Sequence, residues 1–141
     1  THGALGNACA EDDELANAVA RGILAVDPNL AFTVMPGTAT ERACHRAGLR
    51  PIREIYADRT YDDNFNLTNR KFKGAVISDT EFALTRVTEM IAEGQLISVT
   101  GKRLTTEIDS VCVHGDTAKA FTMAKTLRDG LEKAGYKVFP A

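Results

Sequence analysis

The spacing of apolar residues predicts a helix over Ala10–Val26, followed by a strand. Apolar side chains recur every three or four positions along this segment, which is the spacing of one helix face: Leu15, Val19, Ile23 and Val26. The acidic run Glu11–Glu14 supplies the negative charge that a helix N-terminus favours. Asp27-Pro28-Asn29 ends the helix, and Leu30–Met35 then forms a short apolar run typical of a buried strand.

A second helix and strand follow. Pro36-Gly37-Thr38 predicts a turn that leads into a helix through Ala47, and Gly48 closes it. After Pro51, the segment Ile52–Ala57 alternates between apolar and polar residues as a strand does.

A long polar segment interrupts the alternation. Asp58–Lys73 is dominated by Asp, Asn, Thr, Arg and Lys without periodicity, which predicts a long loop of a kind that often carries function. Ser78-Asp79-Thr80-Glu81 resembles a helix cap, and the apolar face behind it predicts a helix up to Gly94. Leu96–Val99 is compatible with a short strand or with a loop.

The last third of the chain predicts two more strands around a long helix. Val111–Val113 is a β-type run, Thr117–Ala134 has helical spacing, and Tyr136–Phe139 is a candidate final strand. Helices that alternate with strands in this way predict an α/β fold in which crossover helices connect parallel strands.

Length and composition indicate one globular domain over residues 1–141. The chain is 44% hydrophobic and 26% charged, and its net charge of −2 comes from interspersed acids and bases, so nucleic acid is not expected as a partner. No apolar stretch approaches the roughly 20 residues that span a bilayer, and no signal peptide opens the chain. We therefore expect no membrane association and a cytoplasmic location.

The cysteine pattern and the absence of glycine-rich motifs give no indication of several common classes of site. Cys9, Cys44 and Cys112 are odd in number and lack CxxC spacing, which favours neither a disulfide framework nor a thiolate zinc site. Cys112 lies in an apolar run and is expected to be a small buried hydrophobe rather than a nucleophile. The sequence has no GxGxxG and no GxxxxGK[ST], so a Rossmann or P-loop nucleotide site is not predicted.

Ionisable residues lie next to apolar stretches at three places. His114 and Asp116 come after Val111–Val113, Asp58 and Arg59 come after the strand that ends at Ala57, and His2 lies beside Gly3-Ala4-Leu5 at the N-terminus. Because parallel strands present their C-terminal ends at one edge of a sheet, we expect these side chains to share a site.

Each of these residues has a catalytic and a structural interpretation. His114 beside a carboxylate can act as a general acid or base, with the carboxylate fixing its tautomer, but Asp116 can equally be a helix N-cap. Arg59 has a planar fork suited to a carboxylate or phosphoryl oxygen, whereas Asp58 and Arg59 can equally form a structural ion pair. Arg70 in the loop is either a binding residue or solvated, and His45 is expected at the surface or in packing.

Four ordered motifs resemble the C-terminal motifs of the LamB/YcsF family. They are His2-Gly3-Ala4-Leu5-x-Asn7, Tyr56-Ala57-Asp58-Arg59-x-Tyr61, Arg70 followed by Gly74-Ala75-Val76-Ile77, and Val111-Cys112-Val113-His114-Gly115-Asp116. The resemblance implies a distorted β/α barrel similar to glycoside hydrolases and deacetylases. It also implies a subunit of ATP-dependent 5-oxoprolinase, which acts with B and C subunits to open 5-oxoproline to glutamate while ATP is hydrolysed.

The family's usual N-terminal motifs, Asp-x-Asn-x-Asp-x-Gly-Glu, Cys-Gly-Phe-His-Ala-Gly-Asp and Ala-His-Pro, do not occur here. We therefore expect the chain to correspond to the C-terminal half of such a barrel, or slightly more. A barrel portion of this kind exposes sheet edges, which predicts an oligomer. Two alternatives stay open: a metal-dependent amidohydrolase or deacetylase, and a non-catalytic module that binds a small acid or a partner subunit.

Overall fold

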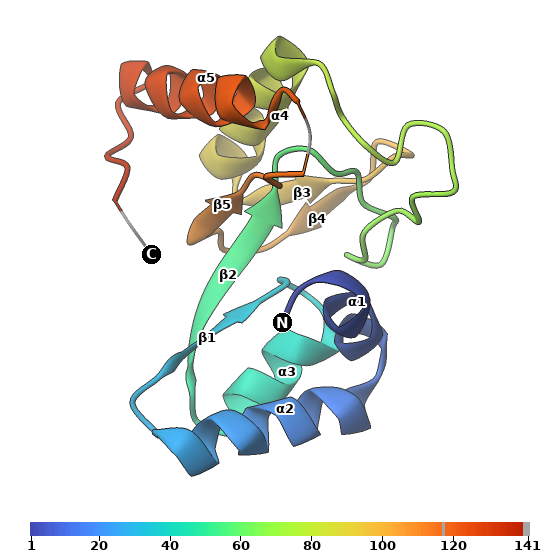
Figure 1. The fold of residues 1–141 in the computed structure, drawn as a ribbon, viewed down its shortest axis with the longest axis vertical. Coiled ribbons are helices and arrows are strands. Elements are labelled where there is room, and N and C mark those ends of the chain that lie inside the picture. The colour runs from blue at the N-terminus through green and yellow to red at the C-terminus, as the bar shows by residue number, and fades with distance from the viewer. Residues whose placement is uncertain (117, 140–141) are drawn as a thin grey trace.

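A computed structural model of the chain describes residues 1–116 and 118–139. Helices gather at the two ends of a small central sheet, with α1 to α3 at one end and α4 and α5 at the other (Figure 1). In chain order the elements are α1 (Gly3–Glu11), α2 (Asp13–Val26), β1 (Ala31–Val34), α3 (Ala39–Arg46), β2 (Arg50–Tyr56), α4 (Thr80–Glu93), β3 (Gln95–Ile97), β4 (Arg103–Thr105), β5 (Ser110–Cys112) and α5 (Ala120–Lys133).

The central sheet is parallel, with strand order β1-β2-β5. Val34 lies opposite Arg53 in β2, while Glu54 lies opposite Ser110 and Tyr56 opposite Cys112 in β5. Helix α3 connects β1 to β2, α4 lies in the connection from β2 to β5, and β3 and β4 form a separate antiparallel hairpin. The predicted α/β class with parallel strands is therefore confirmed.

Apart from Arg53, which lies opposite Val34, the register gives the sheet one apolar face and one polar face. Since neighbouring residues of a strand point to opposite faces, Phe32, Val34 and Ile55 share one face, and all are buried. One core cluster joins that face to α2 and α3, and a larger one lies under α4 and α5. The opposite face carries Glu54 and Tyr56 beside Cys112, so chemistry collects on that side of the sheet.

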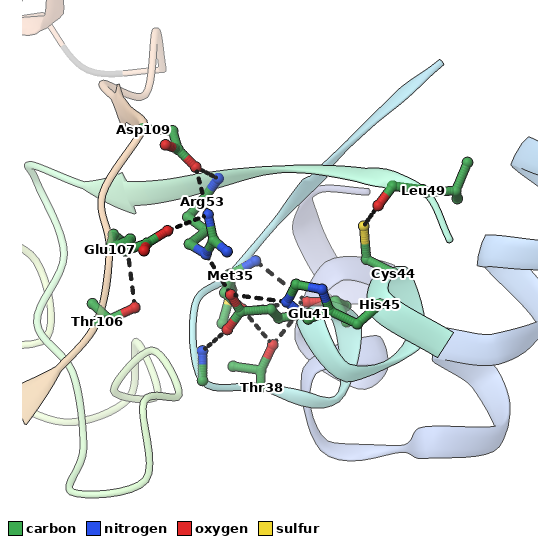
Figure 2. Close-up of polar contacts among 12 residues, drawn as sticks. Met35, Thr38, Glu41, Cys44, His45, Leu49, Arg53, Thr106, Glu107 and Asp109 are labelled. Atoms are coloured by element: carbon green, nitrogen blue, oxygen red, sulfur yellow. Dashed lines mark hydrogen bonds and ion pairs between the residues drawn. The ribbon is translucent and has the colours of Figure 1, made fainter. Parts of the chain in front are cut away.

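An ion-pair network attaches α3 to the sheet. Arg53 Nε donates to Glu41 Oε1 at 2.5 Å, and its backbone N–H donates to Asp109 Oδ2 at 2.9 Å, next to β5 (Figure 2). The second oxygen of Glu41 accepts the backbone N–H of Gly37 at 2.7 Å. One arginine therefore joins β2, α3 and the segment before β5.

The predicted first helix is in fact two helices. Asp12 interrupts Ala10–Val26 because its backbone is extended and its side chain accepts the N–H groups of Glu14 and Leu15, which makes it the N-cap of α2. The segment Gly3–Glu11 forms α1, with His2 at its N-cap position, and no helix was predicted before Ala10. The apolar spacing continues across the break, so periodicity did not reveal it.

The strand predicted at the C-terminal end of the chain also needs correction. Tyr136–Phe139 forms no strand. The Tyr136 N–H donates to the Leu131 carbonyl at the end of α5, and the side chains of Tyr136 and Val138 pack against the larger core cluster.

The segment Leu96–Val99, for which a strand or a loop was expected, overlaps the short strand β3, and its hairpin partner β4 was not predicted. Thr117, the predicted start of the last helix, lies outside the described residues, and α5 begins at Ala120. Among the described helices, none combines the length and apolar character needed to cross a membrane.

Candidate active-site cleft

A cleft of about 390 Å³ opens between the start of α1, the end of β2 and the segment after β5. Five of the six candidate site residues line it: His2, Arg59, Arg70, His114 and Asp116. The sixth, Asp58, contacts the cleft residue His114 directly. The topology therefore brings together residues that are up to 114 positions apart in the sequence.

His114 and Asp58 form a hydrogen-bonded pair. The Nδ1 atom of His114 lies 2.8 and 2.9 Å from the two carboxylate oxygens of Asp58. The Asp58 side chain is 7% exposed and the His114 side chain 21% exposed, so the carboxylate is buried behind a partly accessible ring. With Nδ1–H donating to the carboxylate, the neutral imidazole keeps its lone pair on Nε2. The carboxylate partner of this histidine is thus Asp58, not the nearer residue in sequence, Asp116.

Tyr56 fixes the ring of His114 from one side. The two rings stack with centroids 5.4 Å apart and an interplanar angle of 21°. His2 contacts the same tyrosine edge-on at 5.8 Å, and its Nε2 lies 3.3 Å from Oε1 of Glu54. Burial, above all, raises the pKa of the Tyr56 hydroxyl above its ordinary value, so Tyr56 stays neutral while its ring contacts both histidines.

The two cleft arginines differ in their surroundings. Arg59 is buried, and it donates through Nε to the Ala75 carbonyl at 3.2 Å and through an NH2 nitrogen to the Thr68 carbonyl at 2.7 Å. Burial and the nearby charge of Arg70 lower the pKa of Arg59 from its ordinary value. Arg70 is half exposed and lies 3.5 Å from Asp116. Arg59 therefore holds the loop in place at the cleft wall, while Arg70 and Asp116 form an exposed pair at its rim.

Sequence reasoning did not select Glu54, Tyr56 or Cys112. Glu54 and Tyr56 stand two residues apart on β2, with Cys112 opposite Tyr56, so the sheet register places all three on the polar face. The period-2 alternation of Ile52–Ala57 could have identified Glu54 as facing the same side as Tyr56. Burial together with the carboxylates of Glu54 and Asp58 raises the pKa of the Cys112 thiol to about 12, so the free thiol is a poor nucleophile.

A second hollow of about 290 Å³ adjoins the cleft along the long loop. It shares Arg59 and Arg70 with the cleft and adds the amide side chains of Asn66 and Asn69. The hollow therefore combines two arginines and amide side chains, which can bind an anion, with the carboxylate of Glu11.

Comparisons with known proteins give a consistent picture. The family model described as LamB/YcsF family matches residues 1–141. The second 5-oxoprolinase A subunit of Bradyrhizobium diazoefficiens is 45% identical over 139 residues, which are 99% of this chain and 54% of that protein. The 5-oxoprolinase A subunit of Gluconobacter oxydans is 41% identical over 138 residues, covering 98% of this chain and 54% of that protein.

A solved structure is similar over nearly the whole chain. The crystal structure of the lactam utilization protein from Thermus thermophilus superposes with a TM-score of 0.86 at 35% sequence identity. The superposition covers 97% of this chain and 54% of that protein. The chain therefore spans about half the length of the relatives it matches.

Proposed function

The chain belongs to the LamB/YcsF family, and from that premise we propose that it carries part of the active site of an ATP-dependent 5-oxoprolinase. The proposed reaction is the hydrolytic ring opening of 5-oxoproline to L-glutamate, coupled to ATP hydrolysis. The observation that carries the proposal is the His114–Asp58 pair at a cleft that also holds two arginines. The names of the relatives, which are 5-oxoprolinases and a lactam utilization protein, support this choice of substrate class.

Opening a lactam requires a base that delivers water to the carbonyl carbon and an acid that protonates the departing amide nitrogen. His114 suits both steps, because Nδ1 is held by Asp58 and Nε2 is left to accept a proton from water. The resulting imidazolium is stabilised by the buried carboxylate and returns the proton to the nitrogen as the C–N bond breaks. The stacked ring of Tyr56 limits rotation of the imidazole during both transfers.

The arginines provide the binding part of the proposal. The substrate carboxylate, or a phosphoryl oxygen from ATP, is an anion that Arg70 can approach at the cleft rim once Asp116 releases it. Arg59 adds positive charge at the wall, where two of its guanidinium nitrogens are already bound to carbonyl oxygens. His2, which contacts Tyr56 edge-on, also lines the cleft.

We also propose the partners and the setting that this function requires. ATP is a co-substrate, and the B and C subunits of 5-oxoprolinase assemble with the protein that carries this chain. The relatives are each named as one lettered subunit of 5-oxoprolinase, which supports an enzyme built from several different chains. Because the proposed reaction consumes ATP, the cytoplasm is its location.

The test is His114→Ala in the natural protein that carries this chain, reconstituted with the B and C subunits. We expect 5-oxoproline-dependent ATP turnover to fall by about a hundredfold or more, as for the loss of a general acid-base residue. Asp58→Asn should also lower turnover, because the amide keeps the shape of the carboxylate without its charge. The melting temperature of each variant is measured alongside activity.

His45→Ala is the matched control, since His45 is an exposed histidine on α3 that lies 3.7 Å from Glu41 and away from the cleft residues. It should retain full turnover. If His114 has only a structural role, His114→Ala should instead cost about 1–3 kcal/mol of stability, with activity lost only in proportion to unfolded protein. Full turnover by the two cleft variants at normal melting temperature would reject the proposal.

A further inference from the structure

Three metal-ligating side chains meet at one edge of the cleft, and none of them takes part in the proton transfers proposed for His114. His2 Nδ1 or Nε2, a carboxylate oxygen of Glu54 and Sγ of Cys112 all lie within 4.8 Å of one another. They come from three separate elements, since His2 precedes α1, Glu54 is in β2 and Cys112 is in β5. Strand pairing, rather than closeness in sequence, therefore assembles the cluster.

The carboxylate of Glu54 gives a second, independent sign of a ligand. Its Oε1 atom is buried and has no hydrogen-bond partner among the described residues, although a buried carboxylate oxygen normally has one. His2 Nε2 lies 3.3 Å from that oxygen without hydrogen-bond geometry. Two ligands about 2.0–2.1 Å from a tetrahedral metal ion are separated by about this distance.

We propose that His2, Glu54 and Cys112 bind a divalent transition-metal ion, with zinc the best match to the donors. An imidazole nitrogen, a carboxylate oxygen and a thiolate sulfur are the three ligand types that Zn²⁺ combines in proteins. Metal binding replaces the proton of the Cys112 thiol, because a coordinating thiol is deprotonated. The proposal does not depend on which reaction the cleft catalyses.

The number of ligands and the position of the proposed metal site next to the cleft together indicate the role of the metal ion. Three protein ligands leave one tetrahedral position for water or a ligand oxygen, which is the arrangement of catalytic rather than structural zinc sites. His2 is both a ligand of the proposed site and part of the cleft lining, so the fourth position adjoins the cleft. Tyr56 contacts both His2 of this metal site and His114, edge-on in the first case and by stacking in the second.

The test titrates the 141-residue chain, freed of metal by chelation and kept reduced, with Co²⁺ and then Zn²⁺. We expect saturable binding of one Co²⁺ per chain with a near-ultraviolet thiolate-to-cobalt charge-transfer band, followed by displacement of Co²⁺ by Zn²⁺. Cys112→Ser should abolish the band. Its affinity for Zn²⁺ should fall by more than the roughly 10- to 100-fold that follows loss of an outer-shell partner.

Glu54→Gln should weaken binding similarly while it retains the charge-transfer band, because the thiolate is still present. Cys44→Ser is the matched control: Cys44 is a buried cysteine in the other core cluster, and its serine replacement can keep the hydrogen bond to the Leu49 carbonyl. It should bind the metal as the parent chain does. Circular dichroism shows whether each variant is folded. If Cys112→Ser does not fold, the Zn²⁺ affinity of Glu54→Gln tests the proposal. Absence of saturable binding, or unchanged Zn²⁺ affinity in a folded Cys112→Ser or Glu54→Gln variant, would overturn the proposal.

Discussion

At the scale of single residues, charge partners matter more than position in the sequence. The strand-end pattern identified His114 and Asp58 separately, but their pairing across 56 residues follows only from β2 and β5 lying side by side. Asp116, the obvious partner by sequence distance, faces Arg70 instead. A sequence pattern therefore indicates which residues have chemistry, whereas the sheet register decides which of them act together.

Asp13 gives a pH-dependent prediction at the same scale. Hydrogen bonds from Arg42 and then Arg46 lower the pKa of its carboxyl from 3.8 to about 2. A carboxyl whose pKa is lowered by folding stabilises the folded state at any pH above its pKa in the unfolded chain. This stabilisation is lost as the pH falls toward the pKa of the same carboxyl in the folded chain. The stability gap between the parent chain and Asp13→Asn should therefore be present at pH 7 and shrink between pH about 4 and about 2.

Melting temperatures across that pH range check this prediction. Glu14→Gln is the control, since it removes a neighbouring exposed acid for which the described part of the chain shows no ion pair. It should show little gap at any pH. A gap for Asp13→Asn that persists undiminished at pH about 2 would contradict the assigned role of the two arginines.

At the scale of elements, periodicity predicted the long segments and local chemistry decided their ends. The cap at Asp79 and the left-handed Gly94 bound α4 as the sequence indicates, because a side-chain acceptor and a residue free to adopt positive φ each have a clear signature. The break at Asp12 was missed because apolar spacing runs through it. The three-residue strands β3 and β4 were difficult to predict because so short a segment shows little periodicity.

The long loop is more ordered at one end than its composition suggests. Tyr61 is fully buried, and its hydroxyl accepts the backbone N–H of Tyr56 at 2.7 Å. The ring of Phe65 lies so close to Gly37 that a side chain there would clash with it, and the positive φ of Gly37 also favours glycine. Residues 69–74, in contrast, are exposed and held by local turn hydrogen bonds.

We predict that the loop is the most mobile internal segment in the absence of ligand, with residues 69–74 opening most readily. Segments with few buried contacts open at a low free-energy cost, so their amides exchange quickly with solvent. Hydrogen exchange should show slower exchange at Thr60 and Thr68, whose N–H groups donate to carbonyls across the loop. Protection of residues 69–74 equal to that of α5 would contradict the prediction.

At the scale of the whole molecule, the parallel sheet is open. Its strand order leaves β1 and β5 each with a partner on one side only among the described residues. An apolar groove of about 670 Å³ lies beside β5, between that strand, α5 and the segment after it. Unpaired backbone groups at a sheet edge, next to exposed apolar surface, favour pairing with another chain.

We therefore predict that the 141-residue chain, studied by itself, self-associates through these edges. Sedimentation velocity should show species larger than the 15.2 kDa monomer, in proportions that increase with protein concentration. Replacing Val111, which lines the groove and packs against the larger core cluster, by lysine places a charge in the groove beside β5. A Val111→Lys chain that melts as the parent does should shift the distribution toward monomer. Lysine at Phe121, an exposed apolar residue of α5 that does not line the groove, is the control and should leave the distribution unchanged. A concentration-independent monomer that melts in one cooperative step would show that β1 and β5 are protected edges, and the open sheet would then be stable without a partner.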